Sequence, residues 1–272
     1  MVNKILAEIK ALGVNAEATT VNKNGVVMQG VTVGEGNVRP NFYIDYYEGT
    51  PEQIACQIVK DYKKIDVPQY DTEMFNSYDN VKDKLMLCIR HVVDDDVATI
   101  PFLDLQLYAR IIVDKNENGI ATTPIKNELI DKWGVNTQQV IDDALACTKP
   151  KYTIASMFNI LMGVAPEFAN DFDCQEARDS MYVMNTTNGM YGASVIYCRE
   201  LVRSIAEKLG GDVYIIPSSI HEIIVIPAGS MSANELSGMI REVNDTCVDP
   251  KEQLSTHAYR YSLENDDYSF FE

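Results

Sequence analysis

The sequence predicts an α+β protein in which antiparallel sheets are covered by helices. Strand-like segments come in pairs separated by turn residues, as in the stretches at 25–33 and 41–47. Each pair precedes a capped amphipathic segment, so strand-strand-helix units repeat along the chain. Hairpins with a helix returning over them are typical of antiparallel sheets with one covered face.

Three helices are predicted before residue 100 of the 272-residue chain. Residues 1–13 carry apolar side chains at helical spacing. Residues 51–63 come directly after Thr50, which has the spacing of a capping box with Gln53 inside the segment. Residues 81–93 also show helical spacing of apolar side chains, and we expect a third helix there.

The second unit is predicted as strands at 105–114 and 120–125, joined by a tight turn at Asn118-Gly119. Two helices follow, separated near Gly134. Residues 151–180 hold few periodic segments. We therefore expect an N-terminal α+β region over 1–150, a connecting segment over 151–180 and a C-terminal α+β region over 181–272.

The C-terminal region is predicted to contain two hairpins and two helices. One hairpin joins 180–185 to 192–198, and the other turns at Ser218-Ser219. Helices are expected near 200–209 and 233–243, because both segments have apolar stripes of the right period. A last strand is expected at 255–263.

Charge and hydropathy exclude several classes of protein. With 40 acidic and 23 basic residues the net charge is −17, which argues against direct binding to nucleic acid or to an anionic membrane. The longest apolar runs fall far short of the ~20 residues that cross a bilayer. The N-terminus has no apolar signal core, and we expect a cytoplasmic protein.

The sequence predicts no metal site and no cofactor. Its six cysteines and three histidines show no zinc-ligand spacing, and the thiols are expected to be reduced and structural. Asp114, Asn116, Asn118 and Gly119 imitate the start of a calcium loop, but Ile125 replaces its bidentate Glu, so calcium is not expected. No glycine-rich phosphate-binding loop occurs.

Residues 125–149 imitate a helix-turn-helix. The second helix of a DNA reader needs cations and base-reading side chains. Here that helix carries Asp142 and Asp143 and no Arg, so a plain pair of core-facing helices is the better interpretation.

Reactive residue types are densest in PSSIHE, where Ser219, His221 and Glu222 are the catalytic candidates. A serine nucleophile needs a histidine base and an orienting third group. Glu222 points to the opposite face of a strand from His221, so we expect no carboxylate behind the ring. The competing interpretation is a structural histidine that bonds Ser219 or a carbonyl.

Small polar residues cluster in a predicted turn beside this hairpin. They could line a ligand cleft at one edge of the sheet. They are also ordinary turn formers, which is the competing interpretation. The ligand-binding candidates are Asn185, Thr187, Asn188, Gly192 and Ser218.

Three stretches carry a resemblance to a known family: NGIATTPIKNELIDKWG, YVMNTTNGMYGASVIY and GGDVYIIPSSIHEIIVIP. Over about residues 25–260 the chain resembles an uncharacterised bacterial family, domain-of-unknown-function family 5688, which is common in anaerobic gut bacteria and has a PSS-x-HE hairpin. The resemblance implies a cytoplasmic bacterial protein, sometimes encoded near mobile elements. It implies no activity and supplies no catalytic residue.

Three functional hypotheses follow. The first is a binding or regulatory protein without catalytic activity that contacts a protein or a small ligand. The second is a hydrolase-like enzyme centred on Ser219 and His221. The third is an acidic mimic of nucleic acid that occupies a basic partner protein.

Overall fold

The computed structural model describes residues 1–65, 72–116, 119–164 and 180–271. The chain forms two compact units, residues 1–76 and 77–272. This division differs from the predicted connecting segment at 151–180, because a strand within that segment belongs to a sheet of the second unit. The predicted α+β class with antiparallel sheets is confirmed.

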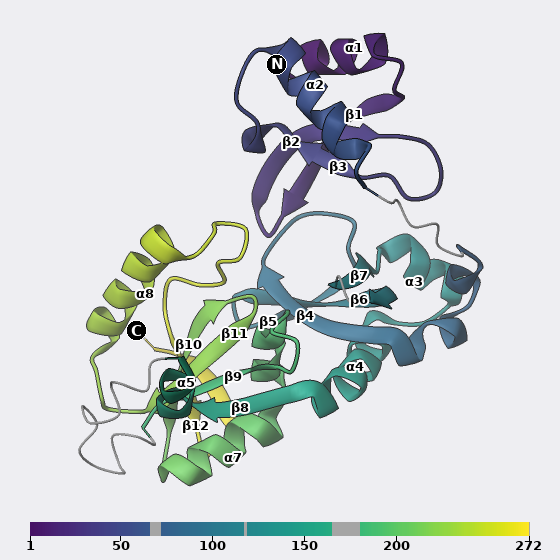
Figure 1. Ribbon diagram of the computed structural model, residues 1–272. Coiled ribbons are helices and arrows are strands. Elements are labelled where there is room, and N and C mark those ends of the chain that lie inside the picture. The colour runs from purple at the N-terminus through teal and green to yellow at the C-terminus, as the bar shows by residue number, and fades with distance from the viewer. Residues whose placement is uncertain (66–71, 117–118, 165–179, 272) are drawn as a thin grey trace. The chain divides into compact units, whose positions relative to one another are not determined.

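The first unit is a three-stranded antiparallel sheet with two helices (Figure 1). Both predicted helices are confirmed, and the Thr50–Gln53 capping box is formed. The first strand was not predicted, since AEATTVNK is too polar to stand out. The elements are α1 (Val2–Ala11), β1 (Ala16–Lys23), β2 (Val26–Val33), β3 (Asn41–Tyr43), the 3-10 helix η1 (Ile44–Tyr46) and α2 (Pro51–Tyr62).

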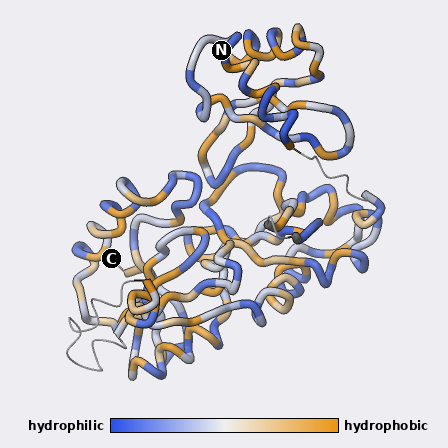
Figure 2. The backbone as a smooth tube through the Cα atoms, viewed as in Figure 1, coloured by the Kyte–Doolittle hydropathy of each residue, from blue (hydrophilic) through white to orange (hydrophobic). Residues whose placement is uncertain are grey.

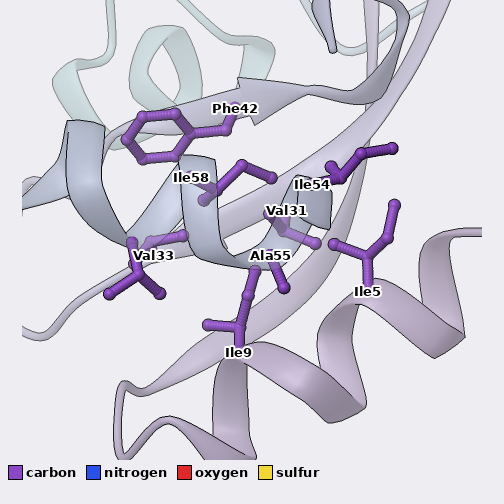
Figure 3. Close-up of a cluster of buried hydrophobic side chains, with 9 residues drawn as sticks. Ile5, Ile9, Val31, Val33, Phe42, Ile54, Ala55 and Ile58 are labelled. Carbon is purple, nitrogen blue, oxygen red and sulfur yellow. The ribbon is translucent and has the colours of Figure 1, made fainter. Parts of the chain in front are cut away.

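The core of this unit lies between the two helices and one face of the sheet. Ile5 and Ile9 of α1 point toward Val31 of β2 and Ile58 of α2 (Figure 3). All four side chains are fully buried. Helix α1 alternates between hydrophobic and hydrophilic residues (Figure 2), as a helix with one buried face must.

The second unit begins with short 3-10 helices and a four-stranded antiparallel sheet. Strand β6 pairs with β4 along one edge and with β5 and then β7 along the other. The predicted hairpin of β6 and β7 is confirmed, with the Asn118 position of its turn outside the described residues. The 3-10 helix η2 (Thr72–Asn76) still belongs to the first unit. The elements of this part of the second unit are η3 (Tyr78–Asn80), η4 (Lys82–Lys84), β4 (Leu85–His91), β5 (Thr99–Phe102), β6 (Leu105–Asn116) and β7 (Gly119–Pro124).

The helix predicted at 81–93 is wrong, because residues 85–91 form strand β4. Residues 85–90 are all buried, so both faces of the strand are covered. A short run that is apolar on both faces has no period of two, and its spacing also fits a helix.

Two helices follow this sheet, α3 (Asn127–Trp133) and α4 (Thr137–Thr148), with η5 (Lys149–Lys151) after them. Gly134 ends α3 in the left-handed conformation, and Asn136 caps α4 by accepting from Gln139 N. Helix α4 packs on β4.

Hydroxyl groups satisfy the free edge of β4 at Leu87. Thr148 Oγ1 accepts from Leu87 N at 2.9 Å, and Ser194 Oγ donates to Leu87 O at 2.9 Å. Ser194 Oγ also lies 2.9 Å from both Tyr152 OH and Tyr191 O. Ser194 is fully buried. Its hydroxyl joins strand β4 to the segments that carry Tyr152 and Tyr191.

The remaining strands form a six-stranded antiparallel sheet of order β13-β12-β10-β11-β9-β8. Predicted helices near 200–209 and 233–243 are confirmed, the second extending to Cys247. The elements are β8 (Tyr152–Ser156), α5 (Met157–Val164), β9 (Tyr182–Thr186), η7 (Gly192–Tyr197), α7 (Arg199–Leu209), β10 (Val213–Ser219), β11 (Glu222–Pro227), α8 (Ala233–Cys247), β12 (Tyr259–Ser262) and β13 (Asp267–Phe270).

Two hairpin predictions need correction. Residues 192–198 are not a strand, because Gly192–Tyr197 form the 3-10 helix η7, and β9 pairs instead with β8 and β11. The hairpin of β10 and β11 is present, but it turns at Ile220-His221 rather than at Ser218-Ser219. A bulge between Ile216 and Ser219 carries the strand past the expected turn.

This sheet is buried on both faces, not on one. Leu236 and Ile240 of α8 pack against Tyr214 and Ile226. The neighbouring residues of each strand point to the opposite face, and Ile215 there is also fully buried. Within the described residues, no helix is long and apolar enough to cross a membrane.

Candidate functional site

The two polar turns singled out in the sequence lie side by side in the second unit. Tyr191 N donates to His221 Nδ1 at 3.2 Å, and Ala193 N donates to Ile220 O at 3.3 Å. Gly192 lies so close to the second turn that a Cβ there would be 2.5 Å from His221 O. The expected juxtaposition of the two turns is therefore present, and a glycine makes it possible.

His221 has a protein neighbour at each of its ring nitrogens, a hydrogen-bond donor at Nδ1 and a carboxylate near Nε2. Nδ1 accepts a backbone N–H from Tyr191, so in the neutral ring the proton is on Nε2. Nε2 lies 3.6 Å from Glu252 Oε1. The expectation that no carboxylate lies behind the ring is therefore wrong. The carboxylate comes from a residue 31 positions away, which strand alternation around His221 could not reveal.

The other members of PSSIHE do not complete a catalytic group. Ser219 Oγ accepts from His221 N at 3.0 Å, a local bond within the turn. Ser218 Oγ lies 3.5 Å from Glu222 Oε1. Ser219 and Glu222 face each other as a strand pair, so Glu222 does not orient the His221 ring.

The ligand-binding candidates of the first turn are engaged mainly with neighbouring residues of the same turn. Asn185 Oδ1 accepts from Thr186 N at 2.6 Å. Thr186 Oγ1 lies 2.8 Å from Asn188 Oδ1, and it accepts from Met190 N at 3.1 Å. Thr187 N donates to Lys151 O at 2.8 Å. These bonds favour the interpretation of Asn185 and Asn188 as turn residues.

Arg110 is a site residue that the sequence did not indicate. Its guanidinium carbon lies 5.5 Å from the centre of the Tyr191 ring, and that ring in turn lies 5.8 Å from the His221 ring. Burial raises the pKa of the Tyr191 phenol. The neighbourhood of Tyr191 thus gathers a cation and an imidazole, with Glu252 beyond the imidazole.

A second grouping of Ser, His and Asp was also missed. Ser255 Oγ lies 3.2 Å from His257 Nδ1, and His257 Nε2 lies 3.5 Å from Asp104 Oδ2. Ser255 is only 3% exposed and its Oγ also accepts from His257 N. Tyr259 OH donates to Asp104 Oδ1 at 2.6 Å, which closes the network. These contacts tie strand β12 to the turn before β6.

Metal-ligating side chains do not converge in the described part of the chain. No group of three or more His, Cys, Asp or Glu residues there could hold a metal ion. Described cysteines carry free thiols: Cys88 and Cys198 are buried, whereas Cys56 and Cys247 are exposed. Burial raises the pKa of the Cys88 thiol to about 12, so this thiol is protonated near neutral pH.

The first unit has an open hollow of about 420 Å³. Its charged groups are largely engaged within the unit, since Arg39 pairs with Glu17 at 2.5 Å and Glu35 accepts from the Asn15 amide. The lining residues are Lys10, Asn15, Ala16, Glu17, Gly34, Glu35, Gly36 and Arg39.

Comparison with known proteins gives a single positive result. No curated protein and no solved structure matches the chain. A family model described as a family of unknown function, DUF5688, matches residues 1–263. That match includes both turns, Arg110 and Glu252. The chain therefore belongs to the DUF5688 family, as the PSS-x-HE hairpin and its neighbouring stretches indicate.

Proposed function

We propose that the protein is a cytoplasmic binding protein without catalytic activity, and that its contact surface includes the paired turns around Tyr191 and His221. One observation carries the proposal: the lone pair on His221 Nδ1 is used by Tyr191 N–H. A neutral ring so held has its proton on Nε2, which faces Glu252. No ring nitrogen is left to take a proton from a serine.

The serine supports the same conclusion. Ser219 Oγ accepts the His221 backbone N–H, a bond typical of a turn serine. A hydrolase would need this oxygen to donate to the ring instead. The polar groups at this edge therefore favour holding a ligand or a partner over attacking one.

Labelling with a fluorophosphonate probe tests the proposal, together with turnover of p-nitrophenyl acetate. The expected result is no stoichiometric labelling and no saturable turnover. Labelling that is lost in Ser219→Ala or in Ser255→Ala would overturn the proposal and identify the nucleophile. Ser204→Ala, a change on the exposed face of α7, is the matched control.

The hypothesis of nucleic-acid mimicry stays a prediction with its own readout. It expects the protein to compete with duplex DNA for a basic protein, with a strong dependence on salt. A binding protein for a small ligand shows no such competition.

A further inference from the structure

Two arginines lie on one face of the sheet formed by β4 and β6. Arg90 is on β4, and Arg110 is on β6 opposite Met86. Because alternate residues share a face, Cys88 and Tyr108 lie between the two arginines. Each arginine also contacts a tyrosine ring, Arg90 at 5.0 Å from Tyr108 and Arg110 at 5.5 Å from Tyr191.

Arg90 has a complete counter-ion. Its two terminal nitrogens donate to the two oxygens of Asp95 at 2.8 and 2.7 Å. The Arg90 side chain is 8% exposed, and a bidentate carboxylate is the usual requirement for a guanidinium at that depth.

Arg110 has no such partner. Its Nε donates to Thr122 Oγ1 at 2.8 Å and one terminal nitrogen donates to Thr122 O at 3.0 Å. No carboxylate within the described residues forms an ion pair with it. The ionisable groups that face it are Cys88, Tyr108 and Tyr191, and burial raises the pKa of each of them. All three are neutral near pH 7, so none balances the charge.

We propose that Arg110 binds the oxyanion group, a carboxylate or a phosphate, of a small-molecule ligand at the edge beside Tyr191. A half-buried cation without a counter-ion is costly, and an oxyanion would remove that cost. The planar guanidinium matches both groups in bidentate geometry. The net charge of −17 repels polyanions such as nucleic acid, so the ligand is small. This inference rests on the proposed binding function and specifies its ligand class.

Thermal unfolding at pH 7.5 in three buffers of equal ionic strength tests the inference. The three share one buffering compound and differ in the added sodium salt, which is chloride, inorganic phosphate or acetate. Phosphate or acetate is expected to raise the Tm of the wild-type protein above its value in chloride. The shift is about 5–9 °C for an anion at ~50 times its Kd. The buffer that gives the larger shift distinguishes a phosphate from a carboxylate ligand.

The matched pair of variants is Arg110→Met and Arg90→Met. In chloride, Arg110→Met should have the same Tm as the wild type, and it should show no rise of Tm in phosphate or acetate. Arg90→Met should have a lower Tm than the wild type in every buffer, because Asp95 loses its ion-pair partner. Arg110→Lys keeps the positive charge but not the planar, bidentate donors of the guanidinium, so its Tm should rise less with the anion than that of the wild type.

Three outcomes would overturn the inference. The first is a wild-type Tm that does not rise in phosphate or acetate, and the second is an equal rise of the Tm in Arg110→Met. The third is a Tm of Arg110→Met in chloride that is lowered as much as that of Arg90→Met. If Arg110→Met does not fold, the response of Arg110→Lys decides, and a response equal to wild type counts against the inference. Failure of the binding function itself has a different signature, since it gives fluorophosphonate labelling or turnover.

Discussion

Removing the Ser194 hydroxyl should destabilise the second unit strongly. Ser194→Ala leaves Leu87 O without its side-chain donor and Tyr152 OH without its acceptor. The contact with Leu87 O is buried, the contact with Tyr152 OH is part-buried, and Ser194 itself is 0% exposed. Each of these two groups left unsatisfied costs ~1–3 kcal/mol, so the expected loss of unfolding free energy is about 2–6 kcal/mol.

Urea unfolding followed by tryptophan fluorescence measures this loss. The chain has one tryptophan, Trp133, which lies in α3 of the second unit and contacts Tyr78 at 5.6 Å between ring centres. The signal therefore reports the unit that contains Ser194, even if the two units unfold separately. Ser204→Ala, on the exposed face of α7, should change the free energy by less than about 0.5 kcal/mol.

A double-mutant cycle tests the physical reason. Tyr152→Phe removes the phenol oxygen that Ser194→Ala would leave unpaired. In the Tyr152→Phe background, Ser194→Ala should therefore cost ~1–2 kcal/mol less than in wild type. A cost of Ser194→Ala below 1 kcal/mol, or strict additivity of the two changes, would refute the reasoning.

Three further predictions concern single positions. Gly192→Ala should unfold the second unit or lower its Tm sharply by circular dichroism, because the new Cβ would lie 2.5 Å from His221 O, a backbone atom; a Tm unchanged from wild type contradicts this. The Leu263 N–H bond lowers the pKa of Asp212, so its stabilisation is present above the unfolded pKa and is lost as pH falls through the lower folded value; Asp212→Asn should flatten the stability profile below about pH 4, and an unchanged slope speaks against the bond. Calorimetric titration should show no calcium binding at the loop that starts at Asp114, because the loop lacks its bidentate carboxylate; a binding heat that Asp114→Ala abolishes contradicts this.

Local signals predicted the helices well. Thr50 and Ser232 cap their helices as the sequence indicates, because a capping box involves residues only three positions apart. Strand β4 was mistaken for a helix, because a strand buried on both faces has no alternation. Segment 192–198 was mistaken for a strand, because its packing against the His221 turn depends on a distant contact of Gly192.

The sequence predicted several residues of the candidate site but not the contacts that join them. Both turns and His221 stand out in the sequence by residue type. Glu252 and Arg110 do not, since their contacts depend on the order of strands and loops in space. The competing interpretation of His221 as a hairpin histidine predicted a bond to Ser219, which exists through the backbone N–H of His221 rather than through its ring.

The free edge of β4 also bears on how the protein avoids self-association. An outer strand with unpaired N–H and C=O groups is a template on which a strand of another molecule can add, a common route to aggregation. Thr148 and Ser194 occupy both edge groups of Leu87 with side-chain hydroxyls, and both hydroxyls are buried. An incoming strand would have to break these bonds before it could pair at this position. Residues 85–89 of this strand are all apolar, and two buried hydroxyls thus oppose the addition of another molecule's strand at Leu87.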